Sequence, residues 1–294
     1  MSPRTTATPP AQRDDGRISD HERVQIDRAN ADGRQPVVFV HGLWLLQNSW
    51  ERWADLFERE GYVALTPDWP GDPATPEAAN VDPGPLAGTT IGEVARHHEA
   101  IIQLLDRKPV LIGHSFGGAL VQILAAKGVS AATVAIDPAG LRGVLPLPFS
   151  ALKAAWPALR NPLNRYRAVP LSFEQFAYSF ANTLDEAEAR DLYDRFVVPG
   201  PGMPLFQAAA ENLNPWSELA LDWRAPERGP LLIMSGDSDH TVPASVARAA
   251  YDHQCANAGI TEFDAVAGRG HSLTIDHGWQ DVAAAALAFV RRFA

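Results

Sequence analysis

A lone serine, Ser115, lies between two glycines in the segment VLIGHSFGGAL, which covers residues 110–120. The apolar run before Ser115 predicts a strand and the run after it predicts a helix, so the serine lies in the turn that joins them. Such a turn raises a side chain above the edge of a sheet, and side chains at Gly113 or Gly117 would collide there with neighbouring backbone. Ser115 is therefore a candidate nucleophile, and the alternative is an ordinary turn or helix-capping residue.

A serine hydroxyl is a poor nucleophile at neutral pH, so Ser115 would need a general base and a group that orients the base. His271, in the segment GRGHS of residues 268–272, lies between a predicted strand and a predicted helix. Acidic residues in the segment SGDSDHTVP of residues 235–243 follow another predicted strand, and Asp137 follows a third one. We expect His271 to lie at the same sheet edge as Ser115, and an acidic residue from one of these loops to orient it.

Short apolar runs alternate with helical patterns from Pro36 onward. This alternation predicts an α/β fold, with a mostly parallel sheet covered by helices on both faces. The predicted strands are residues 37–40, 62–66, 110–112, 133–136, 231–234 and 261–266. The predicted helices include residues 91–105, 118–127 and 279–293.

Residues 141–225 do not fit this alternation, because they are rich in proline and aromatic residues and contain no strand-like run. Phe173, Phe176 and Phe180 recur at helical spacings, which predicts two or more helices inserted over the sheet edge. Two interpretations are open. These aromatic residues form the insertion's own core, or some of them line an apolar substrate pocket beneath it.

The composition limits the classes of partner. The chain has 294 residues, 46% of them hydrophobic, and a net charge of −10, which makes nucleic acid an unfavourable partner. No apolar run reaches the roughly 18 residues that cross a bilayer, so we expect no membrane partner. Residues 1–35 are polar and lack a secretory signal, so we expect a disordered tail. With its single cysteine, Cys255, the chain is expected to be cytoplasmic.

No metal or cofactor is expected. The other histidines, among them His97, His98, His240, His253 and His277, do not have the spacing of a metal-binding motif with acidic residues or cysteine. No glycine-rich loop after a predicted strand has the form that holds a nucleotide. The sequence leaves the oligomeric state open.

Four segments together resemble the α/β-hydrolase superfamily: HGLW at residues 41–44, GHSFGG at 113–118, SGDSDHTVP and GRGHS. The order Ser, Asp, His along the chain is also that of this superfamily. The resemblance covers residues 36–294 and is closest to small cofactor-independent serine hydrolases with a helical cap. It implies an α/β-hydrolase core made of residues 36–140 and 226–294, and a helical cap made of residues 141–225.

The resemblance also implies roles for individual residues. It makes Ser115 the nucleophile, His271 the base and Asp239 the orienting acid, because residues 236–243 match the superfamily pattern G-x-x-D-x-x-V-P. Asp237 is then a turn residue. Asp137 is the rival acid, since some members of the superfamily carry the acid after that earlier strand.

The pair His41-Gly42 resembles the loop that forms an oxyanion hole in this superfamily. The backbone amides of Leu43 and Phe116 would then face the reacting carbonyl. Trp44 is either a competing donor or a wall of the substrate pocket. His41 and the histidine next to the nucleophile, His114, are expected to be structural.

The expected activity is hydrolysis of a neutral, apolar carboxylic ester or lactone through an acyl-enzyme. Because the turn carries serine rather than aspartate, the alkyl-enzyme chemistry of the related haloalkane dehalogenases and epoxide hydrolases is not expected. A perhydrolase or cofactor-free haloperoxidase and a C–C bond hydrolase would use the same three residues. A ligand-binding protein without catalysis is the alternative outside enzymes.

Overall fold

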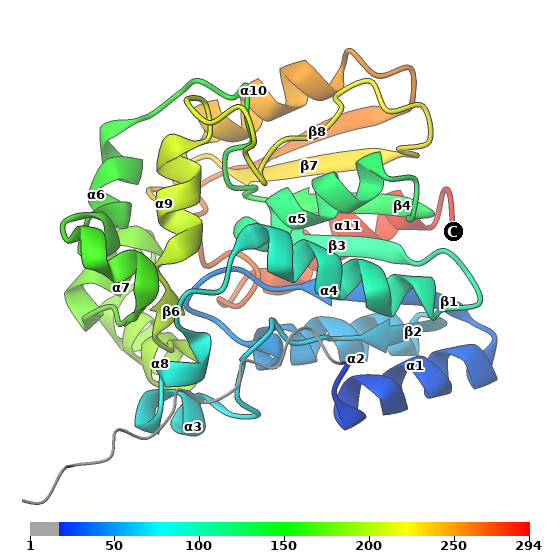
Figure 1. The fold of residues 1–294 in the computed structure, drawn as a ribbon. Coiled ribbons are helices and arrows are strands. Elements are labelled where there is room, and N and C mark those ends of the chain that lie inside the picture. Colours follow the sequence, from blue (N-terminus) through cyan, green and yellow to red (C-terminus); the bar gives the residue numbers. More distant parts are fainter. Residues whose placement is uncertain (1–17) are drawn as a thin grey trace, which may run out of the picture.

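A six-stranded parallel sheet forms the centre of the computed structural model, which describes residues 18–294 (Figure 1). The strand order is β2-β1-β3-β4-β7-β8, and each neighbouring pair is parallel. The strands are β1 (Gln35–Val40), β2 (Tyr62–Leu65), β3 (Val110–His114), β4 (Ala132–Ile136), β7 (Leu231–Gly236) and β8 (Thr261–Val266). Each overlaps a predicted strand, so the predicted α/β fold class with a mostly parallel sheet is confirmed.

Helices connect the strands and cover the sheet. They are α1 (Asp20–Asp32), α2 (Glu51–Arg59), α3 (Pro76–Val81), α4 (Ile91–Gln103), α5 (Phe116–Ala126), α6 (Phe149–Leu159), α7 (Phe173–Ser179), α8 (Glu186–Phe196), α9 (Met203–Ala210), α10 (Ala244–Gln254) and α11 (Trp279–Val290). Short 3-10 helices lie at Gln47–Trp50, Gly84–Leu86 and Pro162–Tyr166. The predicted helices at 91–105, 118–127 and 279–293 correspond to α4, α5 and α11.

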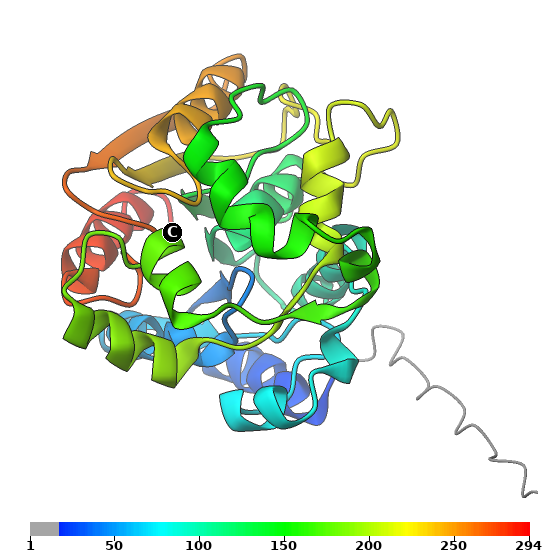
Figure 2. The ribbon, with the colours of Figure 1, turned by 90° about the vertical axis from the view of Figure 1, so that its left-hand side faces the viewer.

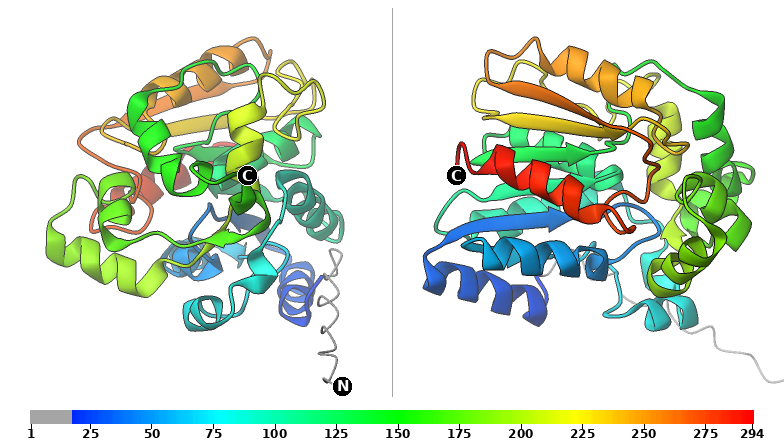
Figure 3. Two further views of the ribbon diagram at one scale, coloured as in Figure 1. Left: turned by 60° about the vertical axis from the view of Figure 1, so that its left-hand side comes forward. Right: turned by 180° about the vertical axis from the view of Figure 1, so that it is seen from behind.

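Alternating strand residues pack against different helices, because successive side chains point to opposite faces of a sheet. Val38 and Val40 belong to an apolar cluster with residues of α1, α4, α5 and α10. Val37 and Phe39 belong to a second cluster with residues of α2 and α11, and the view from behind shows those two helices over the sheet (Figure 3). The strands β1 to β4 and β7 are buried on both faces, which explains why they are mostly continuous apolar runs, whereas the edge strand β8 is only partly buried.

The strand order reverses beside β1, which pairs with β2 on one side and with β3 on the other. In open parallel sheets, ligand sites lie outside the carboxyl ends of the strands near such a reversal. The loops that leave the carboxyl ends of β1, β3, β4, β7 and β8 carry His41, Ser115, Asp137, Asp239 and His271.

The segment between β4 and β7 holds the helices α6 to α9, which gather at one end of the sheet (Figure 1) and face the reader in Figure 2. It also holds a short antiparallel pair, β5 (Ala168–Val169) with β6 (Gly200–Pro201). The expectation that residues 141–225 contain no strand is therefore wrong for this pair. The expected helices over the sheet edge are present.

The expected disordered tail over residues 1–35 is wrong from Asp20 onward, because residues 20–32 form α1; residues 1–17 lie outside the described part. Ser19 and Glu22 cap the start of α1 reciprocally. Only two of its apolar side chains, those of Ile26 and Ala29, are buried in the core. A buried ion pair of 2.7 Å between Glu22 and His97 of α4 adds a polar anchor. A count of apolar residues therefore does not predict α1, because an ion pair supplies part of its contact with the core.

Over residues 18–294, no helix combines the length and the apolar character that crossing a membrane requires.

Replacing Ile26 with alanine tests the docking of α1. Ile26 is 3% exposed, so Ile26→Ala should lower the free energy of unfolding by about 2–4 kcal/mol. Val24 on the same helix is 67% exposed, and Val24→Ala should change that free energy by less than about 0.5 kcal/mol. Denaturant unfolding of both variants makes the comparison. Equal losses would contradict the packing of α1 on the core.

Candidate active site

Ser115 occupies a strained turn between β3 and α5. Its backbone has φ 58° and ψ −121°, in a region that residues other than glycine rarely adopt. Hydrogen bonds to the neighbouring strand end hold this conformation: the amide of Ser115 donates to the carbonyl of Ile136 at 2.9 Å, and the carbonyl of Ser115 accepts from the amide of Ala139 at 2.9 Å. The turn lies where the sequence predicts it.

The glycines around this turn are required by close backbone approach. A Cβ atom on Gly113 would overlap the carbonyl group of Gly117, and a Cβ atom on Gly117 would overlap the carbonyl oxygen of Val40. The start of α5 therefore lies directly against the end of β1. This is the collision that the sequence predicts for Gly113 and Gly117.

His271 and Asp239 form a fully buried pair. The Nδ1 atom of His271 lies 2.6 Å from the Oδ2 atom of Asp239, and both side chains are 0% exposed. The other carboxylate oxygen accepts hydrogen bonds from the amides of Thr241 at 2.6 Å and Val242 at 3.0 Å. With its proton on Nδ1, the imidazole has a free lone pair on Nε2. That buried Nε2 atom has no hydrogen-bond partner within residues 18–294, so it is available to accept a proton.

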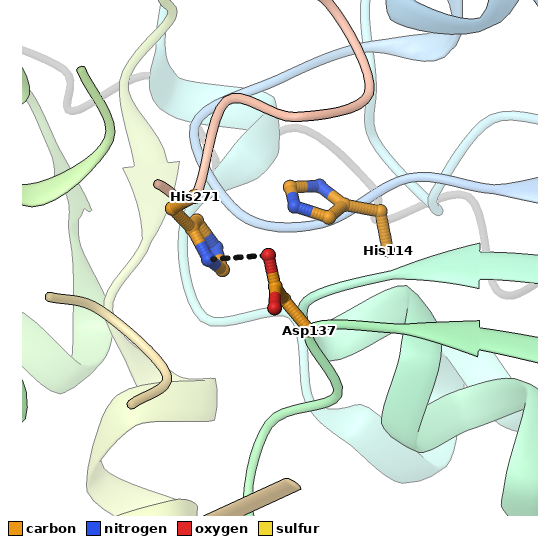
Figure 4. Close-up of side chains that lie close together, drawn as sticks. All are labelled: His114, Asp137 and His271. Atoms are coloured by element: carbon orange, nitrogen blue, oxygen red, sulfur yellow. Dashed lines mark ion pairs between the residues drawn. The ribbon is translucent and has the colours of Figure 1, made fainter. Parts of the chain in front are cut away.

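Asp137, the rival acid, also lies beside this pair. Its Oδ2 atom is 3.9 Å from the Nδ1 atom of His271 (Figure 4), and its Oδ1 atom accepts a hydrogen bond from the amide of Gly236 at 2.8 Å. Burial, together with the adjacent charge of Asp239, raises the pKa of Asp137 well above its ordinary value. The shorter contact, 2.6 Å against 3.9 Å, favours Asp239 over Asp137 as the carboxylate partner of the imidazole.

His114 packs against His271, with ring centroids 4.6 Å apart (Figure 4). Burial and the nearby imidazole of His271 hold the pKa of His114 well below its ordinary value, so its ring is neutral. His114, Asp137 and His271 each offer a possible metal ligand, and these atoms lie within 4.8 Å of one another. A metal on His271 would occupy either the nitrogen that holds Asp239 or the one that can take a proton. The site thus remains predicted to act without metal.

The loop after β1 is held by a buried ion pair. The Nε2 atom of His41 lies 2.9 Å from a carboxylate oxygen of Asp72, and its ring stacks on Trp69 with centroids 5.3 Å apart. Burial lowers the pKa of His41, but the hydrogen bond and the charge of Asp72 outweigh burial, so the pKa lies above its ordinary value. His41 thus anchors the loop, as its expected structural role requires.

The two predicted amide donors, Leu43 and Phe116, belong to segments that adjoin Ser115. A Cβ atom on Gly42 would come within 2.7 Å of the Cβ atom of Ser115, so the loop that carries Leu43 abuts the serine. Phe116 is the first residue of α5, where backbone amides have no partner within the helix. Among the bonds of the described chain, neither the amide of Leu43 nor that of Phe116 donates to another group. Both are free to bind an oxyanion.

Trp44 ties this loop to the insertion. Its indole Nε1 donates to the carbonyl of Val169 at 2.9 Å, and its own carbonyl accepts from the amide of Val198 at 3.0 Å. Its backbone has a φ of 64°, which these bonds stabilise. The indole also lines the cavity beside Ser115. Trp44 thus lies in the wall of the cavity, and its contact with substrate stays a prediction.

A cavity of about 170 Å³ opens beside Ser115 beneath α6 and α9. Small and aliphatic side chains form most of its wall, including Ala151, Leu152, Leu205 and Ala208. The predicted aromatic series does not line it. Phe176 and Phe180 are buried, stack on each other at 5.4 Å and belong to the same apolar cluster as one face of the sheet. The cavity beneath the insertion thus has aliphatic residues in place of these aromatic ones.

The end of α7 contacts the loops of Asp239 and His271, which sequence reasoning missed. The ring of Phe180 lies edge-on to His271 at 4.7 Å, and its carbonyl accepts from the amide of Ser272 at 3.0 Å. Asn182 donates to the carbonyl of Ser238 at 2.8 Å. The only signal was the helical spacing that contains Phe180.

The carboxylate of Asp237 joins its own turn to the loop after β8. It accepts from the hydroxyl of Ser238 at 2.8 Å and from the amide of Gly268 at 2.8 Å.

The sequence profile of the Alpha/beta hydrolase family matches residues 37–285. No curated protein sequence matches the chain significantly.

Solved structures share the fold at low sequence identity. A monoacylglycerol lipase of Paleococcus ferrophilus is 22% identical, over 88% of this chain and 95% of that one, with a TM-score of 0.58. The pyrethroid hydrolase PytH is 18% identical, over 88% and 98%, with a TM-score of 0.61. A protein of Mycobacterium tuberculosis described as a non-heme bromoperoxidase is 20% identical, over 88% and 93%, with a TM-score of 0.62.

The ion pair of His41 predicts a pH dependence of stability. Since the folded-state pKa of His41 is raised, its stabilisation is complete below about pH 6.5 and is lost as the pH rises through the raised value. Burial and the charge of Asp72 also raise the pKa of Asp68 to about 7. The stability that Asp68 contributes therefore also decreases as the pH rises, up to about that pH. A tenfold difference in proton affinity between the folded and the unfolded chain corresponds to about 1.4 kcal/mol of stability.

Asp72→Asn removes a charge that raises the pKa of both His41 and Asp68. The wild-type protein should therefore have the larger unfolding free energy, and its advantage over this variant should be larger at pH 6 than at pH 8. Denaturant unfolding at the two pH values measures the difference. Asp55→Asn, at an exposed position of α2, serves as the control and should show no such change. A difference between wild type and Asp72→Asn that is constant with pH would contradict the ion pair.

Proposed function

We propose that this chain, which belongs to the alpha/beta hydrolase family, is a serine hydrolase of neutral carboxylic esters or lactones. Ser115 is the nucleophile, His271 the general base and Asp239 the residue that orients the base. The reaction proceeds through an acyl-enzyme on Ser115 and needs no metal or cofactor.

In the first half of the reaction, the Nε2 atom of His271 takes the proton of Ser115 while the serine oxygen attacks the ester carbonyl. The amides of Leu43 and Phe116 stabilise the oxyanion of the tetrahedral intermediate. The imidazolium then protonates the leaving alcohol, and the ester bond breaks. In the second half, His271 activates a water molecule, which releases the acid and restores the serine.

One observation carries the proposal: a buried imidazole whose Nδ1 is held by a carboxylate and whose Nε2 is unpaired within residues 18–294, in the same site as a strained serine. The carboxylate fixes the tautomer and stabilises the imidazolium that forms during catalysis. A buried nitrogen without a partner has a free-energy cost that a bound hydrogen-bond donor would offset. The proton of the nucleophile is the group that it would accept.

The cavity beside Ser115 supports a small to medium, neutral substrate. Its wall is mostly aliphatic, and no lysine, arginine or histidine of the described chain lines it. A charged acyl group would lose its hydration there without gaining a counter-charge. The partner of this protein is accordingly proposed to be a small apolar ester rather than a nucleic acid or a membrane.

Replacing the nucleophile or the base should remove nearly all turnover. Ser115→Ala and His271→Ala should each lower kcat for a p-nitrophenyl ester by about 10⁶, the loss known for another serine hydrolase. Ser245→Ala, at an exposed position of α10, is the control and should keep full activity. Substantial hydrolysis by purified Ser115→Ala would refute the mechanism.

The two candidate acids should respond differently to amide substitution. Asp239→Asn keeps the shape but presents the wrong imidazole tautomer, so kcat should fall by about 10⁴. Asp137 lies 3.9 Å from the Nδ1 atom of His271, too far for a hydrogen bond, and an asparagine can still accept from the amide of Gly236, so Asp137→Asn should cost less than about tenfold. Steady-state kinetics with one activated ester compares them. A severe Asp137→Asn with a mild Asp239→Asn would reverse the assignment of the acid.

A further inference from the structure

A single carboxyl group interrupts the apolar wall of the cavity beside Ser115. It belongs to Glu211, which directly follows α9 and is 6% exposed. Its Oε2 atom is buried and has no hydrogen-bond partner in residues 18–294. The proposed hydrolytic mechanism makes no use of this group.

The charged side chains on neighbouring elements are engaged elsewhere. Arg142 donates to the carbonyl of Pro215, and His253 is bonded to the carbonyl of Gly143. Lys153 of α6 lies over the ring of Tyr178, and Arg248 of α10 lies over the ring of Phe263. None of these four side chains lines the cavity, and apart from Glu211 neither does any other charged side chain of the described chain.

The other polar side chains of the wall are accounted for. Thr241 donates its hydroxyl to the carbonyl of Ser179 at 2.7 Å, the indole of Trp44 donates to Val169, and Ser115 is the proposed nucleophile. Glu211 is thus the remaining polar side chain of the wall, and one of its oxygens has no partner in residues 18–294. A buried polar group without a partner costs roughly 1–3 kcal/mol, which a ligand that supplies the partner would offset.

We propose that Glu211 forms a polar subsite that hydrogen-bonds an oxygen atom of the substrate, on the part of the ester that enters the cavity beyond Ser115. This inference rests on the proposed serine-hydrolase function. The preferred substrate is a neutral ester or lactone whose apolar chain carries an ether, hydroxyl or carbonyl oxygen away from the scissile bond.

The protonation state of Glu211 decides which partner it accepts. Burial raises the pKa of Glu211 to about 8, so at pH 7 the group is an uncharged carboxyl that can donate its proton to an acceptor oxygen. A site built around such a group discriminates against an isosteric chain that lacks the oxygen, because the carboxyl is then left unpaired. For one hydrogen bond we expect a preference of about tenfold.

Matched p-nitrophenyl esters test the subsite. Each pair compares a straight alkyl acyl chain with the same chain in which an ether oxygen replaces one methylene, at successive positions. The wild-type protein should prefer the ether ester at one position by about tenfold in kcat/KM. This preference should fall as the pH rises through about 8, where the carboxyl loses its proton.

Three variants assign the preference to Glu211. Glu211→Leu should abolish it and raise the activity on the alkyl ester. Glu211→Gln, which keeps an uncharged donor, should retain a preference and lose its dependence on pH near 8. Glu227→Gln, at an exposed position, should match the wild type. An unchanged preference in Glu211→Leu, or none at any position in the wild type, would overturn the subsite.

Binding without turnover separates this inference from the proposed function. In Ser115→Ala, the Kd values of the uncleaved ester pair can be measured by calorimetry, with and without Glu211→Leu. A preference for the ether ester that depends on Glu211 supports the subsite even if the wild type hydrolyses neither ester, an outcome that would refute only the hydrolase function. Equal Kd values for the two esters would refute the subsite alone.

Discussion

The hydrogen bond between Asp239 and His271 is the interaction on which the site depends. It joins the loop after β7 to the loop after β8, and it is buried where water cannot substitute for either partner. Two backbone amides of its own loop also hold the carboxylate, so its position does not depend on the imidazole alone. This pair fixes which nitrogen of His271 is free, and with it the direction in which a proton can move.

The parallel sheet and the insertion supply the rest of this geometry. The loops after five strands carry the site residues at one edge of the sheet, and the strained turn at Ser115 is hydrogen-bonded to the end of β4. The insertion contacts both loops. The hydroxyl of Thr241 donates to the carbonyl of Ser179. The ring of Phe180 contacts the imidazole, and its carbonyl accepts from the amide of Ser272. The segment that covers the cavity therefore also contacts the loops that carry Asp239 and His271.

The fold and the local motifs could be predicted because each is encoded in a short stretch of sequence. Buried strands are continuous apolar runs, and the glycines around Ser115 are dictated by backbone contact. What escaped prediction depends on contacts between distant segments. Helix α1 is docked partly by the Glu22–His97 pair, and the raised pKa of Asp137 follows from burial beside another carboxylate. The unpaired oxygen of Glu211, within residues 18–294, is likewise visible only once its surroundings are assembled.

Covalent labelling with a fluorophosphonate, followed by peptide mapping, tests whether Ser115 is a nucleophile activated by His271. The reagent reacts with a serine whose hydroxyl is activated by a base and whose oxyanion is stabilised. We expect one adduct per chain, on Ser115, with complete loss of ester hydrolysis, and no adduct in His271→Ala. Hydrolysis that persists after full labelling, or an adduct on a different residue, would contradict it.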